Sequence, residues 1–463
     1  MARLKGRLAR TRELLSECEV VPEELVQCVS RLKEFMAPFS RHFGRREMRE
    51  HGEDFVRGLL SDLDRKSVEP IAERAGKDRR GLQRFIGQGG WDHRCMTEEL
   101  CGQVGSEIGT PAGILVLDPT TFIKKGNDSI GVGRQWCGRT GQVENCQKGV
   151  FLGYVSNLGR TLVDMRLYLP EKWVIDRQRL DECHAPAAIK HRTACELGLE
   201  LVLERGKLLP HAWVVADDEF GRNADFRVDL HQEKERYVMD VPGRTAVCDV
   251  EQAREEKHAS HLVWTQARRW KDTLTEEHWT PIKIRAGSKG PVIYHATRKR
   301  VLARWRTRPA PVEEWLIVLR SDDTKPEYSY CLSNAAEDVG LEEIVQAGCA
   351  RFWIEDCFER AKGQVGLADY ETRSWDGWHH HVTLSLLSLW FLVKEQRRLK
   401  NSTPAITLQQ SKAAISELLR NPDMDARTLA EKITRRLQRT EQSRVAHWSR
   451  LGMLAPPHSL EEK

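Results

Sequence analysis

The sequence predicts an α/β protein in which a mixed sheet flanked by helices carries a β-rich insertion, with a helical domain before it and a helical tail after it. Two apolar runs indicate the sheet. Gly113 to Asp118 ("GILVLD") and His211 to Gly221 ("HAWVVADDEFG") have the composition of strands buried on both faces, and both contain acids after the apolar residues. The alternation of strand-like and helical segments around them predicts the flanking helices. At 463 residues the chain is too long for one core, which predicts several structural units.

Residues 1–105 are expected to form a helical DNA-binding domain. Within it, Ser67 to Gln88 contains a short helix, a Gly-bearing turn and a second helix, which is the layout of a helix-turn-helix. The second helix would present Lys77, Arg79, Arg80 and Arg84. Many small helical hairpins share this layout, so DNA contact and a purely structural hairpin are both open interpretations.

Residues 106–243 are expected to form the first part of the sheet domain. Two strand-like runs, Val150 to Asn157 and Thr161 to Pro170, lie close together and predict an antiparallel meander with the first apolar run. The Gly-, Lys- and Arg-rich segment 119–149 is expected to be a loop. The remaining elements of this part are a helix, a strand, a second helix and a strand, with the first helix around Ala187 to Leu209 and the last strand in Arg236 to Gly243.

The rest of the chain divides into three predicted units. Residues 244–338 carry short β-like runs bounded by Gly and Pro and are expected to be the insertion. Residues 339–400 are expected to be the second part of the sheet domain, with an amphipathic helix in Arg351 to Gly366. Residues 401–463 are expected to be a basic helical tail. The apolar stripe of the amphipathic helix consists of Ile354, Phe358, Ala361 and Val365.

Composition narrows the class of protein. With 40% hydrophobic residues and fourteen tryptophans, the chain is globular rather than disordered. No apolar stretch reaches the roughly 20 residues of a membrane span, and no signal-peptide pattern follows the basic N-terminus, so we expect no membrane association and a cytoplasmic location. The twelve cysteines are therefore expected to be reduced thiols.

Charge is unevenly distributed along the chain. The net charge is only +5, but residues 253–308 contain fourteen Lys or Arg against five Asp or Glu, interleaved with tryptophans. Residues 394–463 contain fourteen against eight. Basic regions with aromatic side chains suit phosphate neutralisation and base stacking, although a solvated basic surface over buried tryptophans gives the same pattern.

Three acids stand out by their positions. Asp118 follows one buried strand, Asp217 follows another, and Glu355 lies on the amphipathic helix with Arg351 and Lys362 on the same face. Carboxylates gathered from strand ends and a covering helix can bind two Mg²⁺ ions through oxygen, with Mn²⁺ as a substitute, and such an ion pair promotes phosphoryl transfer on nucleic acid. Each acid alone also fits a turn, a helix cap or a solvent-facing side chain.

These residues lie in segments that resemble the DDE transposases of bacterial insertion sequences. Arg351, Glu355 and Lys362 match the R-x₃-E-x₆-K part of the branch with a Y-x₂-R-x₃-E-x₆-K signature. "WIEDCFERAKGQVGLADYETRSWDGWHHH" resembles the third block of a DDE endonuclease subgroup. The segments around Asp118 and Asp217 resemble its other two blocks, and the resemblance covers about 60% of the chain, from Leu115 to Leu392. One position departs from the signature, because Gly348 stands where the tyrosine is expected.

The resemblance implies an RNase H-like fold and a metal-dependent DNA transposase. Asp118, Asp217 and Glu355 would be the catalytic residues and the ligands of two Mg²⁺ ions. Alignment favours Asp217 over Asp218 and Glu355 over Glu359. The partners implied are transposon terminal inverted repeats, target DNA and a second copy of the chain. A catalytically silent DNA-binding relative and an RNase H-like nuclease without strand transfer are the alternatives.

The expected DNA contacts are mostly basic and aromatic side chains. Arg351 and Lys362 would meet the backbone near the cleaved phosphate, and a tryptophan of the insertion would stack on a flipped base. The full set comprises Arg351, Lys362, Lys124, Lys125, Arg134, Trp264, Trp270, Trp279, Arg298, Lys299, Arg300, Trp305 and His381.

Overall fold

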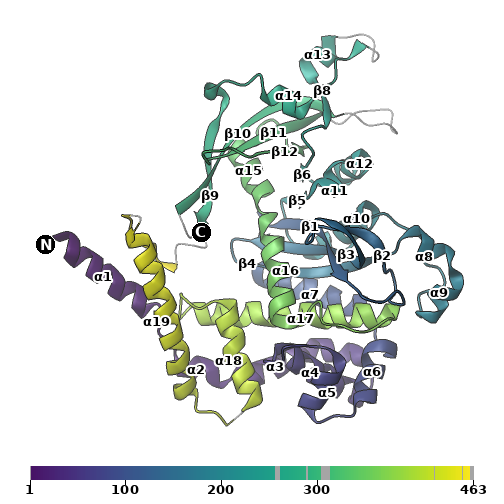
Figure 1. Ribbon diagram of the computed structural model, residues 1–463, viewed down its shortest axis with the longest axis vertical. Helices are drawn as coiled ribbons and strands as arrows, with labels where there is room; N and C mark the ends of the chain where they lie inside the picture. Colours follow the sequence, from purple (N-terminus) through teal and green to yellow (C-terminus); the bar gives the residue numbers. More distant parts are fainter. Residues whose placement is uncertain are drawn as a thin grey trace.

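The computed structural model describes residues 2–255, 261–287, 290–303, 313–421, 423–450 and 452–458. A 12-stranded mixed sheet with helices around it forms the centre, and helical segments lie at both ends of the chain (Figure 1). This confirms the predicted fold class. In the described residues, no helix is long and apolar enough to cross a membrane.

The sheet runs from a hairpin near the start of the domain to the strands of the predicted insertion. Its order is β2 (Gly133–Cys137), β3 (Gln142–Ser156), β1 (Ile114–Ile123), β5 (Trp213–Ala216), β6 (Tyr237–Asp240), β12 (Tyr328–Ser333), β11 (Glu313–Ser321), β10 (Gly290–Ala303), β7 (Ala246–Asp249) and β8 (Thr265–Gln266). β4 (Gly159–Tyr168) pairs with β3, and β9 (Thr280–Gly287) pairs with β10.

The predicted meander is confirmed, because β3 pairs antiparallel with both β1 and β4. The prediction that 119–149 is a loop is wrong in part. β1 continues to Ile123, and β2 forms a hairpin with the first residues of β3. The frequent glycines of this segment concealed the alternation of exposed and buried residues along β2.

The helix predicted around Ala187 is shorter than expected. α10 (Ala194–Arg205) begins at Ala194 because Thr193 caps it: the Thr193 hydroxyl accepts from the Glu196 backbone, and the Glu196 carboxylate accepts from the Thr193 backbone. Preceding it are two short helices, α8 (Glu171–Ile175) and α9 (Arg177–Glu182).

The strands between β6 and α15 (Leu341–Cys349) join the same sheet, since β12 pairs antiparallel with β6. They are accompanied by α13 (Val250–Glu255) and α14 (Ala267–Lys271). The boundaries of the insertion and of the other predicted domains stay a prediction.

Helices cover both faces of the first half of the sheet. On one face Gly198 of α10 lies against Leu117, and on the other Gly153 lies against Ile354 of α16 (Phe352–Val365). α17 (Trp375–Lys400) also packs on β4 and is buried over most of its length. It lies between the sheet and the helices of residues 28–88 (Figure 1), whereas the helix of residues 93–108 contacts β4 directly.

The N-terminal helices confirm the predicted helical segment. They are α1 (Ala2–Ser16), α2 (Pro22–Val26), α3 (Cys28–Ser40), α4 (Arg46–Leu60), α5 (Val68–Ala75), α6 (Arg79–Gln88) and α7 (His93–Ile108). α5 and α6 form the predicted helix-turn-helix layout, with Gly76 in the left-handed conformation at φ 62° between them. Lys77, Arg79, Arg80 and Arg84 are all exposed.

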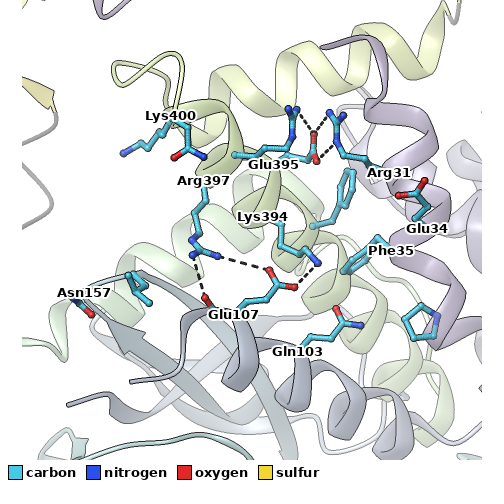
Figure 2. A pocket seen from close by; sticks show the side chains of 15 residues that line it. Arg31, Glu34, Phe35, Gln103, Glu107, Asn157, Lys394, Glu395, Arg397 and Lys400 are labelled. Atoms are coloured by element: carbon cyan, nitrogen blue, oxygen red, sulfur yellow. Dashed lines mark hydrogen bonds and ion pairs between the residues drawn. The ribbon is translucent and has the colours of Figure 1, made fainter. Parts of the chain in front are cut away.

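Ion pairs connect the N-terminal helices to the end of α17. Figure 2 shows them around a cavity of about 720 Å³, in which Glu395 accepts from Arg31 at 2.8 Å and Glu107 accepts from Lys394 at 2.6 Å. The helices of the tail, α18 (Leu408–Arg420) and α19 (Ala426–Arg450), pack against α17 and α2 respectively. The basic residues of this cavity therefore serve to join helices.

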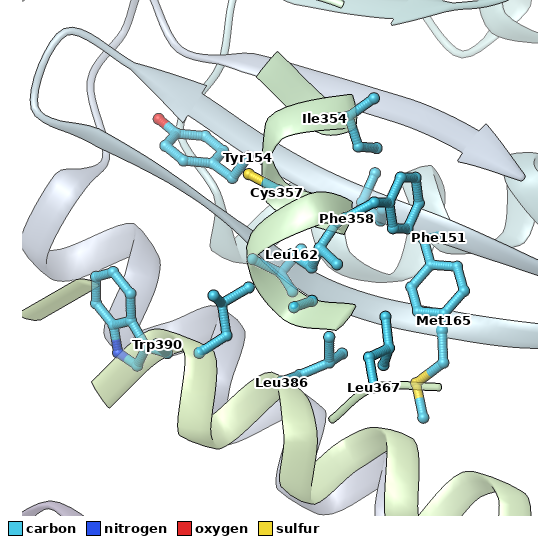
Figure 3. Close-up of a cluster of buried hydrophobic side chains, with 14 of the residues drawn as sticks. Phe151, Tyr154, Leu162, Met165, Ile354, Cys357, Phe358, Leu367, Leu386 and Trp390 are labelled. Atoms are coloured by element: carbon cyan, nitrogen blue, oxygen red, sulfur yellow. The ribbon is translucent and has the colours of Figure 1, made fainter. Parts of the chain in front are cut away.

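The apolar face of α16 holds the helix on the sheet. Ile354, Phe358, Ala361 and Val365 are all buried, as the stripe predicts. The Phe358 ring meets Phe151 of β3 edge-on at a centroid distance of 5.2 Å, within the cluster drawn in Figure 3. This packing fixes which residues α16 turns toward the sheet edge.

Phe358 offers a direct test of that anchoring. Replacing it by alanine leaves a cavity beside Phe151, so we expect Phe358→Ala to lower the free energy of unfolding by about 3 kcal/mol. Chemical denaturation monitored by circular dichroism measures the loss. Phe352→Ala on the same helix, where the side chain is 43% exposed, is the matched control and should cost about 0.5 kcal/mol. Equal losses in the two variants would contradict the assigned packing.

Candidate functional site

Three aspartates lie side by side at one edge of the sheet. β1, β5 and β6 are parallel neighbours, with Leu117 opposite Ala216 and Ala216 opposite Met239. The next residue of each strand or strand end is Asp118, Asp217 or Asp240. Carboxyl ends of adjacent parallel strands are a common location for binding sites.

Two of these carboxylates are in an environment that opposes their ionisation. Burial, followed by the nearby charge of Asp217, raises the pKa of Asp118 well above its ordinary value. Burial, followed by Glu219, raises the pKa of Asp217 to about 6, although the Asp217 side chain also accepts a hydrogen bond from the Glu219 backbone at 3.0 Å. A bound proton or a bound cation would therefore stabilise the Asp118 and Asp217 carboxylates.

Arg351 supplies positive charge to this edge from α15–α16. Its Nε lies 2.9 Å from an Asp240 oxygen, while its Nη1 lies 3.8 Å from Asp118 and 3.5 Å from Glu355. The guanidinium is thus bound closely to Asp240 and loosely to the other two acids. Glu355, with a side chain 58% exposed, extends from the first turn of α16.

Asp240 was missed by the sequence analysis. Burial raises its pKa, and it also accepts a hydrogen bond from the Cys331 thiol at 3.2 Å. The signal was present, because Asp240 follows the apolar residues Tyr237 to Met239 within the strand-like run Arg236 to Gly243, much as Asp118 follows the apolar residues of the first run. That signal could identify a third acid at the edge but not its pairing with Arg351.

Lys362 lies on α16 two turns after Glu355. Its ammonium donates to the Thr120 hydroxyl at 2.7 Å, two residues beyond Asp118. Burial, followed by the charge of Arg139, lowers the pKa of Lys362. Lys362 and Arg351 therefore both reach the part of β1 around Asp118.

The donor set suits a hard divalent cation. Asp118, Asp217 and Glu355 offer only oxygen ligands, and the raised pKa values show two of these carboxylates without full charge compensation. Within the described ranges, no three His, Cys, Asp or Glu side chains are grouped closely enough to hold a metal ion. The exposed Glu355 side chain would have to turn toward the aspartates to complete such a group.

The other residues of the sheet domain that were predicted to contact DNA differ in how exposed they are. Lys125 and Arg134 are exposed. The Lys124 ammonium donates to the Tyr370 carbonyl at 3.1 Å and lies over the Tyr370 ring, and burial lowers its pKa to about 8. His381 is buried in α17 and bonds the Gly366 carbonyl at 2.8 Å, so it supports the turn after α16.

The predicted contacts in residues 244–338 lie away from the three aspartates along the sheet. Trp270 and Trp279 are half-buried and pack on a small core of this region, and Trp264 is half-buried. The Arg298 and Arg300 guanidinium groups lie over the Trp315 ring, and Lys299 pairs with Asp249. Trp305 lies outside the described residues.

A cavity of about 300 Å³ opens beside Arg351. Its lining includes Asp240, Glu355, Gly348 and, from β10, Tyr294. At Gly348 an added Cβ would lie 3.0 Å from Val238 Cγ1, so a larger residue there requires the Val238 side chain to move slightly. The tyrosine of this cavity is instead Tyr294.

The raised pKa of Asp217 predicts a pH-dependent effect on stability. Since its folded value of about 6 exceeds its ordinary value of 3.8, the folded state binds more protons between these values, and stability falls as pH rises through them. We expect Asp217→Asn, which keeps an oxygen to cap Glu219, to raise Tm at pH 8 and to change it little at pH 4. Thermal unfolding without divalent ions measures this, with Asp181→Asn, at an exposed position of α9, as the control. Equal Tm values for wild type and Asp217→Asn at pH 8 would exclude the effect.

The Asp240–Arg351 contact predicts energetic coupling. In a double-mutant cycle of Asp240→Asn and Arg351→Gln, we expect a favourable interaction of about 1–2 kcal/mol in the free energy of unfolding, because the pair is largely withdrawn from solvent. Denaturant unfolding of the four proteins provides the values. Additive effects of the two substitutions would show that the contact is not formed in solution.

Comparison with known proteins places these residues in a family context. A family model described as DDE superfamily endonuclease matches residues 38–291, more than half of the chain, including Asp118 and Asp217 but not Glu355. A probable transposase for insertion sequence element IS701 from Microchaete diplosiphon is 24% identical over 324 residues, covering 68% of this chain and 74% of that protein.

One solved structure also shows a weak similarity to this chain. The piggyBac transposase synaptic complex with hairpin DNA, determined by cryo-EM, gives a TM-score of 0.38 at 11% identity, with 94% of this chain and 81% of that chain covered. At that TM-score the likeness supports no conclusion about this chain. The family match over more than half of the sequence establishes that the chain belongs to the DDE superfamily endonucleases.

Proposed function

We propose that this chain is a metal-dependent DNA transposase that cleaves transposon ends and joins them to target DNA. The observation that carries the proposal is the pair of buried carboxylates, Asp118 and Asp217, on adjacent parallel strands with Glu355 on the helix above them. Family membership and the IS701 relative support it. The proposed catalytic residues and metal ligands are Asp118, Asp217 and Glu355.

The chemistry requires a cation that the aspartates can hold. Two Mg²⁺ ions, or Mn²⁺ in their place, would activate the attacking oxygen and stabilise the leaving oxygen. Water attacks the phosphorus at the transposon end, and the bond to the 3′-oxygen breaks to leave a 3′-hydroxyl. That hydroxyl then attacks a target phosphodiester, forming one bond and breaking another. Asp118, Asp217 and Glu355 orient these groups without forming a covalent bond to DNA.

Cationic side chains on either side of Asp118 suit the substrate backbone. Arg351 is oriented by Asp240, and Lys362 is oriented by Thr120. Each presents charge toward the position where a scissile phosphate would bind. The exposed Arg80 and Arg84 of α6 are proposed to contact DNA further from the reaction, within a helical DNA-binding domain of residues 1–105. Because two ends must be cut and joined together, we propose that a homodimer acts on the DNA.

Cleavage of supercoiled plasmid carrying the element's ends tests the catalytic assignment. We expect nicking by the wild type with Mg²⁺ and none with EDTA. Glu355→Gln and Asp118→Asn should each reduce the rate at least about a hundredfold, because the charge that stabilises the transition state is lost. Equal nicking by wild type and Glu355→Gln would rule out the role of Glu355.

Two controls complete this experiment. Glu359→Gln, one turn along α16, should retain cleavage, which tests the choice of Glu355. Short duplexes ending in the terminal repeat should yield strand-transfer products with the wild type. Cleavage without such products would identify a nuclease rather than a transposase.

A further inference from the structure

The β2–β3 hairpin has one face unlike the rest of the sheet. Opposite residues share a face, and the pairs Arg134–Asn145 and Trp136–Val143 lie on the same side. The Trp136 side chain is 63% exposed, the highest value among the described tryptophans, and Val143 is 46% exposed. This face has no acid, because Glu144 is opposite Gln135 on the other side.

The hairpin also bends back toward the acids. The Cys137 thiol lies 3.1 Å from the Thr121 hydroxyl, three residues along β1 from Asp118. At the turn, Arg139 is close enough to Lys362 to lower the pKa of that ammonium. The exposed tryptophan is thus on an element that borders the proposed reaction site.

A neighbouring loop adds positive charge to the same side. The Asn145 amide donates to the carbonyls of Lys124 and Gly126 at 2.9 and 3.0 Å, which ties this loop to the hairpin and positions the exposed Lys125 near its face. Within the part of the chain that the structure describes, neither Arg134 nor Arg139 pairs with a carboxylate.

A single exposed tryptophan on a protein surface needs no special explanation. Here, however, β2 is an edge strand whose exposed Trp136 lies between Arg134 and Arg139 in the sequence, and neither guanidinium has a carboxylate partner among the described residues. Guanidinium groups beside an aromatic ring are complementary to phosphates beside a nucleobase, and stacking requires a base whose face is free. An intact duplex offers no such base except at its ends.

We infer that the β2–β3 hairpin, residues 133–146, binds an unpaired nucleotide of DNA, with the base stacked on Trp136 and the flanking phosphates held by Arg134 and Arg139. The choice of DNA rests on the proposed function, whereas the contact itself does not depend on catalysis. The contact of Cys137 with Thr121 shows that the hairpin as a whole borders the strand that carries Asp118.

Binding measured in EDTA tests the inference separately from cleavage. The probes are a fluorescent blunt duplex and the same duplex with a short single-stranded extension, followed by anisotropy. We expect Trp136→Ala to raise Kd for the extended probe about tenfold and for the blunt probe less than about twofold, while Trp136→Phe stays within about threefold of wild type. Arg134→Gln should weaken both probes and reduce the salt dependence of binding by about one ion.

The control is Leu158→Ala, a variant of another exposed apolar residue in the turn that follows β3, which should leave both Kd values unchanged. Unchanged binding by Trp136→Ala, equal weakening of both probes, or no binding by the wild type to either probe would overturn the inference. Metal-dependent cleavage with a silent Trp136 would reject the inference alone. Binding through Trp136 without any cleavage would reject the proposed function alone.

Discussion

The guanidinium group of Arg351 counters the negative charge on which the candidate site is built. Parallel pairing of β1, β5 and β6 brings three aspartates to one edge, where their mutual repulsion opposes folding. Arg351 is held at 2.9 Å by Asp240 and reaches Asp118 and Glu355 at longer distances. It stabilises the edge while leaving the Asp118 and Glu355 oxygens without a close partner among the described residues, which is the condition for a site that also accepts a cation.

The position of Arg351 in turn depends on apolar packing at some distance from it. Phe358 and Ile354 seat α16 against β3, and the same helical geometry turns Lys362 toward Thr120 of β1 and leaves Glu355 exposed beside Arg351. α17 covers the adjacent β4, is itself buried and contacts α16. For this reason α16 has little freedom to rotate about its own axis. Chemistry at the sheet edge and packing in the core are therefore linked through one helix.

Local sequence patterns predicted the elements that have a strong period. Apolar spacing predicted the strands that precede Asp118 and Asp217, the apolar stripe of α16 and the α5–α6 hairpin. Resemblance to a family favoured Glu355 as the expected third acid. Pairings between distant segments were not predictable: the joining of β12 to β6, the partnership of Asp240 with Arg351, and the burial of His381 all depend on long-range contacts. The β2–β3 hairpin was missed because its glycines indicate a loop, although the chain around them pairs regularly.

Charge balance links the acids to the cations around them. Four carboxylates, those of Asp118, Asp217, Asp240 and Glu355, face two cationic side chains, Arg351 and Lys362, so a fully ionised edge would repel a phosphate. The raised pKa values of the aspartates express the same imbalance in the absence of another cation. Divalent ions of the proposed kind would remove it and release any protons that the aspartates retain. Asp118 lies in the middle of β1, and the β2–β3 hairpin contacts the following residues of that strand at Thr121. The backbone of a bound strand can therefore be attracted by Lys362, Arg139 and Arg134 while only its scissile phosphate reaches the acids.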